Sequence, residues 1–329
     1  MPGVLRRNVL VRGAALAALV VALVAAGMSL DLEALQRSIP MDSWPLLAVA
    51  LAAGAAAMAF RAMGWRPFVA RLAPADKVTW SGLFVPVATA SFLNGILPAR
   101  SGEAARIALV SRRLDVGAAR VTGTVVSDAF GSLVAWAILA GALLVATAPG
   151  GVTPVIVGVA WIAVAVGAVA AAATRADGPE QNRPGRRAIR VLRAVVVALG
   201  EGMRGLRDLR ASVPAVAASI GAWVAQLMVV AVVLEALVPV GVTPAMIACT
   251  FIMFTAAQAA PLLPGGIGTT QAAVMTPLVA IYGVGAAQAL AVAVVLPLAL
   301  WLPVALIGWL AGTHAALREP LARAATQEG

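Results

Sequence analysis

Long uninterrupted runs of apolar residues constrain this chain more than any other feature. Several runs approach or exceed the roughly 18–20 residues that a helix needs to cross the hydrocarbon core of a membrane. Apolar residues make up 62% of the sequence and charged residues 12%, about half the charged fraction of an ordinary soluble domain. Because lipid offers the backbone no hydrogen-bond partner, each run is expected to be a helix. The sequence therefore predicts an all-α, polytopic membrane helix bundle.

Nine apolar runs are separated by short connections. The runs lie at 10–30, 44–60, 79–97, 119–147, 152–174, 212–238, 244–262, 269–283 and 286–311. The net charge of +10 comes largely from arginines in the connections. That pattern is typical of inner-membrane proteins that obey the positive-inside rule, and it does not require a nucleic-acid partner. It places 61–78 in the cytoplasm and the acidic stretch 29–43 outside.

The connection at 175–211 divides the single membrane domain, 1–329, into a first half at 10–174 and a second half at 212–311. It contains nine arginines and four acidic residues, so it is predicted to be a cytoplasmic basic loop. Part of it has the pattern of an amphipathic helix lying on the inner leaflet. The first run, which could also be a signal peptide, is predicted to be retained, with both termini in the cytoplasm of a multi-pass inner-membrane protein.

The stretch 98–120 conflicts with a simple alternation of spans. If 79–97 crossed the membrane, this arginine-rich stretch would lie outside, against the positive-inside rule. A break around Pro98, which cannot continue a helix cleanly, removes the conflict. The segment 79–113 is then a re-entrant helical hairpin that enters from the cytoplasm and returns. The alternative is an ordinary span at which the rule is locally violated.

The second half carries similar motifs. Leu97-Pro98 with Gly102 recurs 166 residues later as Leu263-Pro264 with Gly268, and a Val-Gly-Ala-Ala motif at 116–119 recurs 168 residues later. Counting spans from the first hairpin makes a second hairpin, 244–283, enter from the outside. The prediction is about six spanning helices plus two re-entrant hairpins in an inverted repeat. Such repeats are common in secondary transporters, whose substrate sites lie near the midplane.

The first break is a candidate anion site. Arg100, Glu103 and Arg106 are three residues apart, so they share a face if a helix resumes after Ser101. The start of that helix offers free N–H groups, and the arginines match the oxyanions of a lipid headgroup. Asn94 flanks the break as polar lining or as a cap. Alternatively, these residues lie at the cytoplasmic surface and only set the topology.

The second break supplies neutral groups. Gly265, Gly266 and Gly268 leave backbone groups free, and irregular backbone at membrane depth must be packed in protein or line a wet cavity. Thr269 and Gln271 follow at the start of the next helix and are candidate substrate-binding residues. The alternative is an ordinary exposed loop.

Asp128 is an acidic residue within the apolar run 119–147. A carboxylate at such a position costs roughly 2.5–3.5 kcal/mol on insertion scales, so it is usually paired or functional. Its expected partner is an arginine of the first hairpin. If it is protonated instead, proton coupling becomes possible, and Asp128 and Glu103 are candidates for coupling or gating.

An enzymatic function is not expected. The single histidine, His314, and the single cysteine, Cys249, cannot form a His/Cys metal cluster within one chain. No Walker nucleotide motif is present, and His314 is the only candidate base for a catalytic triad. No cofactor or metal is therefore predicted.

The motifs of the two breaks resemble those of the lysylphosphatidylglycerol synthase transmembrane regions, which are flippase-like membrane domains. The residues that carry the resemblance are Asn94, Leu97-Pro98, Gly102-Glu103 and Arg106, followed by Pro264-Gly265-Gly266-Ile267-Gly268. The resemblance extends from roughly 10 to 312. The family often has an acidic-basic pair in the span after the first motif, whereas here Asp128 is followed by Ala129.

The resemblance implies lipid handling. In the two-part synthases an aminoacyl transferase domain follows the membrane region, whereas here the sequence ends soon after the last run, so lysine transfer is not expected. The leading hypothesis is translocation of an anionic or polyprenyl-linked lipid across the cytoplasmic membrane. The alternatives are a membrane enzyme acting on a lipid-linked substrate and a non-transporting partner of lipid-synthesis enzymes. The sequence does not predict the oligomeric state.

Overall fold

The structure is a computed structural model that describes residues 40–74, 76–96, 102–147, 208–239, 241–259 and 268–325. Regular structure in these residues is entirely helical, with the short 3-10 turn η1 (Met41–Ser43) and eight α-helices. The all-α prediction is therefore confirmed for the described part of the chain. The predicted spans at 10–30 and 152–174, and the basic loop as far as 207, lie outside the described residues.

Four of the helices are long and apolar enough to cross a membrane. These are α3 (Trp44–Val69), α6 (Ala118–Thr147), α9 (Leu209–Leu237) and α12 (Ala286–Ala325), of which the apolar part of α12 is Ala286–Ile307. They match four of the predicted spans. The four shorter helices are α4 (Trp80–Ile96), α5 (Gly102–Leu114), α10 (Pro244–Ala259) and α11 (Thr269–Ala280).

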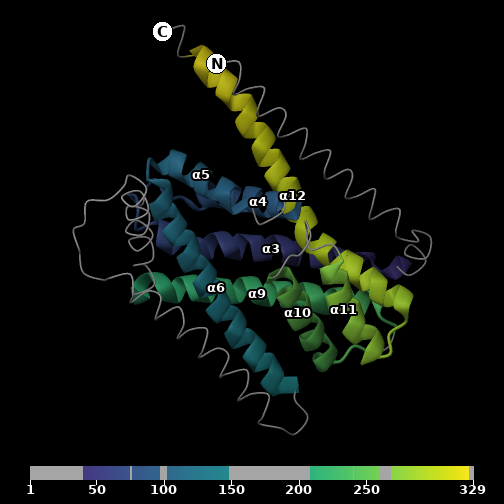
Figure 1. The fold of residues 1–329 in the computed structure, drawn as a ribbon. Helices are drawn as coiled ribbons and strands as arrows, with labels where there is room; N and C mark the ends of the chain where they lie inside the picture. The colour runs from purple at the N-terminus through teal and green to yellow at the C-terminus, as the bar shows by residue number, and fades with distance from the viewer. Residues whose placement is uncertain are drawn as a thin grey trace, which may run out of the picture.

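Helices α3 and α9 lie side by side and antiparallel at the centre of the molecule (Figure 1). Phe68, near the end of α3, is buried against Ala211 and Ala215 near the start of α9. At the other end, the Ser43 hydroxyl donates a 2.7 Å hydrogen bond to the carbonyl of Ala236. The pair therefore forms the axis on which the other helices pack.

Helices α4 and α5 form an antiparallel hairpin next to the end of α3. The Gly102 N–H donates to Asn94 Oδ1 at 2.8 Å where the two helices meet, and Arg113 donates to Thr79 Oγ1 at 3.4 Å at the other end. A Cβ at Gly102 would lie 2.1 Å from the carbonyl oxygen of Ala90. Only glycine allows this approach of the two backbones.

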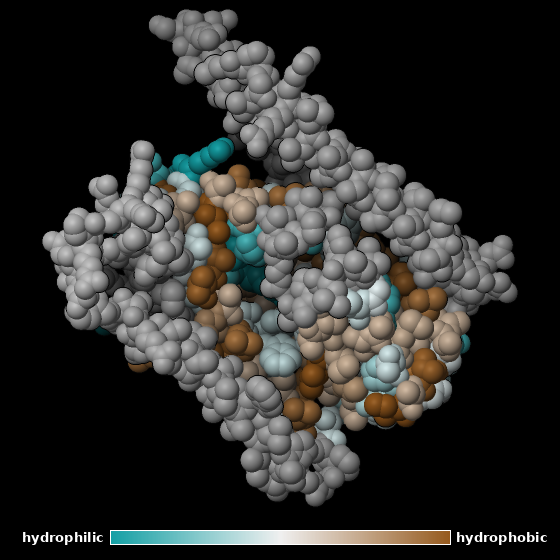
Figure 2. All heavy atoms as spheres, in the orientation of Figure 1, coloured by the Kyte–Doolittle hydropathy of each residue, from teal (hydrophilic) through white to brown (hydrophobic). Residues whose placement is uncertain are grey.

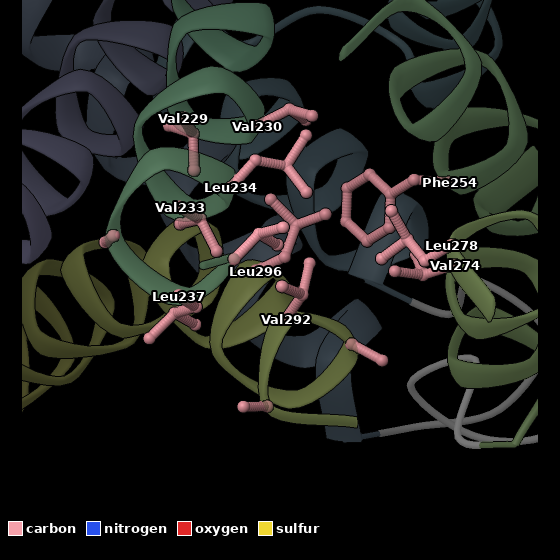
Figure 3. Packing of buried hydrophobic residues seen from close by; sticks show 14 of the residues in the cluster. Val229, Val230, Val233, Leu234, Leu237, Phe254, Val274, Leu278, Val292 and Leu296 are labelled. Carbon is pink, nitrogen blue, oxygen red and sulfur yellow. The ribbon is translucent and has the colours of Figure 1, made fainter. Parts of the chain in front are cut away.

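Helices α10 and α11 form a second pair next to the end of α9. Phe254 of α10, together with Val274 and Leu278 of α11, packs against α9 and α12 in one large buried cluster (Figure 3). Because α3 and α9 are antiparallel, α4 and α10 begin at opposite ends of the α3–α9 pair. The two short-helix pairs are therefore attached to opposite ends of the bundle.

A second apolar cluster connects α3 with the first hairpin and α6. Trp65 and Val69 of α3 pack there with Leu83 of α4, Val110 of α5 and Val121 of α6, and all five are buried. The cluster fixes α5 and the first half of α6 against the same stretch of α3. It thereby determines which polar side chains of these helices can meet.

The predicted loop at 61–78 is wrong in its first part, because α3 continues to Val69. Arg61 ends the apolar run in the sequence, but it does not end the helix, since Ala62, Trp65 and Phe68 continue the buried face. Arg61 therefore belongs to a membrane-length helix. Its side chain contacts α9 and does not lie in a connecting loop.

Candidate functional site

Arg106 of α5 lies between two carboxylates. Its Nη1 donates to Asp128 Oδ2 of α6 at 3.2 Å, and its Nε lies 2.9 Å from Glu103 Oε2 on its own helix. The second contact is an ion pair without hydrogen-bond alignment, because neither atom has a hydrogen-bond partner in the described part of the chain. The prediction that an arginine of the first hairpin pairs with Asp128 is confirmed.

Trp65 of α3 supports the guanidinium of Arg106. Cζ of Arg106 lies 4.4 Å from the centroid of the Trp65 ring, which is a cation–π contact. The ring is held in place because its Nε1 donates to Thr124 Oγ1 of α6 at 3.1 Å. Both Trp65 and Thr124 are fully buried, and a desolvated cation–π pair of this kind contributes about 2 kcal/mol. The position of Arg106 is thus fixed from α3 as well as from α6.

Asn94 of α4 joins the same network. Its Oδ1 accepts the Gly102 N–H at the start of α5, and its Nδ2 lies 3.4 Å from Glu103 Oε1. The amide thus satisfies a backbone donor that the first turn of α5 leaves free. Asn94 acts as a cap supplied from the preceding helix, and it also orients Glu103.

The two carboxylates that contact Arg106 differ in their exposure to solvent. The Glu103 side chain is 38% exposed, Asp128 17% and Arg106 9%. Figure 2 shows a hydrophilic area set back in a hollow between apolar atoms, where α3, α4 and α6 lie close together in Figure 1. Glu103 is the group most accessible to a ligand, and Asp128 is the more enclosed counter-ion.

One face of α6 carries a row of polar groups. Thr124, Asp128, Ser132 and Trp136 are four residues apart, so each lies next to the following one on the helix surface. In the same order, their partners are Trp65 of α3, Arg106 of α5, Trp223 of α9 and Thr255 of α10. Ser132 takes part through its backbone carbonyl, which accepts from the Trp223 indole N–H. Helix α6 therefore joins the first hairpin to α10 of the second through side-chain hydrogen bonds at four successive turns.

The start of α11 is capped by a side chain of its own first turn. Gly268 has φ of 85°, a conformation that favours glycine, and its N–H donates to Gln271 Oε1 at 2.6 Å. Thr269 is half-buried and opens the helix. Of the predicted site, Asn94, Glu103, Arg106 and Asp128 are brought together by hydrogen bonds and ion pairs. Arg100, Ser101, Gly265 and Gly266 lie outside the described residues.

The family described as Lysylphosphatidylglycerol synthase TM region matches residues 11–308 of this chain. The chain belongs to this family. A search of curated proteins and a search of solved structures each gave no significant match. The family and the four long apolar helices make the chain a multi-pass membrane protein of a lipid-related family.

In this lysylphosphatidylglycerol synthase TM-region protein, sequence reasoning missed the residues that support Arg106. Thr124 was detectable, because it lies one helical turn before Asp128 on the same face. Trp65 carried no such signal, since a tryptophan in an apolar run is usually a core residue. No group of three or more metal-ligating His, Cys, Asp or Glu side chains occurs in the described residues.

Proposed function

We propose that this protein translocates a lipid with an anionic headgroup across the cytoplasmic membrane, and that the headgroup binds at Arg106. The observation that carries the proposal is a buried guanidinium held between two carboxylates and over an aromatic ring, within a bundle of membrane helices. Ionisable residues inside membrane segments are costly and usually functional.

A phosphodiester can replace one of the two carboxylates. It presents paired oxygens to the guanidinium in the same way as a carboxylate does. Glu103 is the group expected to leave, because it is the more exposed and its contact with Arg106 lacks hydrogen-bond alignment. Asp128 remains as the fixed counter-ion. Arg100 and Ser101, which precede α5, are proposed to extend the same site.

Glu103 and Asp128 are proposed to couple or gate the transport step without any metal or cofactor. Both carboxylates contact the guanidinium that the headgroup would bind. When a headgroup takes the place of Glu103 on Arg106, the Glu103 side chain is released on the more exposed side of the site, while Asp128 stays paired with Arg106.

The arrangement of the hairpins supports an alternating-access route. The α4–α5 and α10–α11 pairs begin at opposite ends of the α3–α9 axis, as an inverted repeat with two re-entrant hairpins requires. We propose that Gly265, Gly266, Gly268, Thr269 and Gln271 complete the headgroup site from the second hairpin. The bilayer lipid is the partner in this scheme, and no catalytic step is involved.

Transport can be tested in proteoliposomes that contain phosphatidylglycerol with a fluorescent NBD group on one acyl chain. Dithionite bleaches only the outer leaflet, so protein-dependent loss of the protected signal measures translocation. The wild type is expected to move NBD-phosphatidylglycerol faster than NBD-phosphatidylcholine. Arg106→Gln is expected to abolish this activity, while Arg112→Gln, the same charge loss at an exposed position of α5, retains it.

The other outcomes decide between the alternatives. The assay is repeated with a panel of anionic lipids that includes a polyprenyl phosphate. If vesicles with wild-type protein bleach no further than empty vesicles for any of these lipids, translocation is rejected in favour of a non-transporting role. Chemical conversion of the added lipid, detected by mass spectrometry, would indicate a membrane enzyme. If the Arg106→Gln protein folds and keeps full activity, Arg106 is not the headgroup-binding residue.

A further inference from the structure

Helix α3 carries a second arginine inside the bundle. Arg61 lies eight residues before Val69, or about 12 Å along the helix axis from that end. Its Nη2 donates to Gln226 Oε1 of α9 at 3.1 Å, and its Cζ lies 5.1 Å from the centroid of the Trp223 ring. An arginine at this depth is held by two residues of a neighbouring membrane helix.

Gln226 has an unsatisfied donor at this position. The residue is only 3% exposed, and its Nε2 has no hydrogen-bond partner in the described part of the chain. The orientation of the amide is fixed, since exchanging the oxygen and nitrogen would place an NH₂ group against the Arg61 guanidinium. A buried NH₂ group inside a membrane bundle, next to a cation, lacks an acceptor, and an oxyanion would supply one.

The environment of Arg61 repeats that of Arg106. In each case a guanidinium lies over a tryptophan ring, and the indole N–H of that tryptophan donates to α6: Trp65 to Thr124, and Trp223 to the carbonyl of Ser132. Asp128 lies between these two positions of α6, one turn from each. Asp128 is already paired with Arg106, at 3.2 Å.

We propose that Arg61, Gln226 and Trp223 form a second binding site for the phosphate of a lipid headgroup. The site lies one helical turn, about 6 Å, farther from the Val69 end of α3 than the Trp65 that supports Arg106. A headgroup that leaves Arg106 then meets a second guanidinium after a short step, with Asp128 between the two. The inference deepens the proposed function and rests on it for the direction of that step.

Lipid-dependent thermal stabilisation of the purified full-length protein in detergent tests the second site. The probe is short-chain phosphatidylglycerol, with short-chain phosphatidylcholine as the baseline. Gln226→Leu, which removes the unpaired amide and keeps the apolar packing, is expected to need about tenfold more phosphatidylglycerol for half-maximal stabilisation. Gln226→Glu, which places a carboxylate against Arg61, is expected to weaken the lipid effect further.

A purely structural role gives a different result. It predicts a change in the lipid-free melting temperature with no change in the half-maximal lipid concentration, and that result would overturn the site. Arg61→Gln is expected to behave as Gln226→Leu does, with Arg112→Gln unchanged. If Arg61→Gln does not fold, the half-maximal lipid concentrations of the two Gln226 variants still decide whether the second site exists. Equal stabilisation by inorganic phosphate at the same concentrations would overturn the lipid assignment.

The transport assay separates this inference from the proposed function. If wild-type protein moves no lipid but Gln226→Leu weakens phosphatidylglycerol binding, the second site stands and translocation fails. If wild-type protein transports and Gln226→Leu matches it in both binding and rate, translocation stands and the second site is rejected.

Discussion

Arg106 donates a hydrogen bond to Asp128 at 3.2 Å, across 22 residues of sequence and between two different helices. The residue after Asp128 is Ala129, so the sequence lacks an adjacent basic partner. The structure supplies that partner from the first hairpin. The acidic residue of α6 is therefore neutralised by tertiary contact, and the hairpin is held against α6 by the same bond.

The strength of this bond can be measured with a double-mutant cycle. Arg106→Gln and Asp128→Asn are each expected to destabilise the protein, and their effects should be non-additive by about 1–3 kcal/mol, as for other groups in one buried network. The measurement is SDS-induced unfolding of the purified protein. The pair Arg112→Gln and Asp128→Asn serves as the control and should be additive. Additivity of Arg106→Gln and Asp128→Asn would mean that the bond contributes nothing to folding.

Glu103→Gln is expected to tighten headgroup binding. Arg106 would keep Asp128 as its counter-ion and lose the competing carboxylate, so phosphatidylglycerol should stabilise the variant at a several-fold lower concentration than the wild type. The lipid titration of the melting temperature gives the comparison. An unchanged or weaker lipid effect would exclude Glu103 as the group that the headgroup displaces.

Gly102→Ala is expected to open the first hairpin. A Cβ at this position would lie 2.1 Å from the Ala90 carbonyl and 2.6 Å from Asn94 Oδ1, so the backbones must separate and the cap is lost. The expected result is a marked loss of folded protein in fluorescence-detected size exclusion. Gly82→Ala is the matched control, because the atoms nearest to its Cβ would be the end of the flexible Arg113 side chain. Equal stability of the two variants would contradict the close approach.

Trp65→Leu should destabilise the protein by about 3 kcal/mol or more, because it removes a large buried ring together with the support of Arg106. Thr124→Val removes only the hydrogen bond to the indole and should cost about 1 kcal/mol. Trp80→Leu, at a 43% exposed tryptophan, should change stability by less than about 0.5 kcal/mol. The same SDS unfolding assay ranks the three, and a different order would mean that Trp65 is not central to the cluster.

Two glycines offer a direct test of the inverted topology. Gly117 follows the first hairpin and Gly241 precedes the second, and an added Cβ at either position has open space around it for 4 Å. In a Cys249→Ala background, a membrane-impermeant thiol reagent applied to intact cells should label Gly241→Cys and spare Gly117→Cys. Labelling of Gly117→Cys from outside would make 79–97 an ordinary span and remove the basis for opposed hairpins.

The sequence alone predicted the helical class, the positions of four membrane-length helices and the pairing of Asp128 with an arginine of the first hairpin. These features follow from local composition: apolar run length determines a helix in lipid, and an isolated carboxylate in such a run needs a cation. Glycine and proline marked the break between α4 and α5 in the same way.

The tertiary structure decided which groups meet. Hydropathy ended the first described span at Arg61, but the helix continues, because Gln226 and Trp223 of α9 receive that side chain. Trp65 supports Arg106 only because tertiary packing sets the rotation of each helix. That packing consists of the antiparallel contact of α3 with α9 and the second apolar cluster, which holds α5 and α6 against α3. Run length and charge are properties of one segment, whereas a contact between side chains depends on the register and rotation of several segments at once.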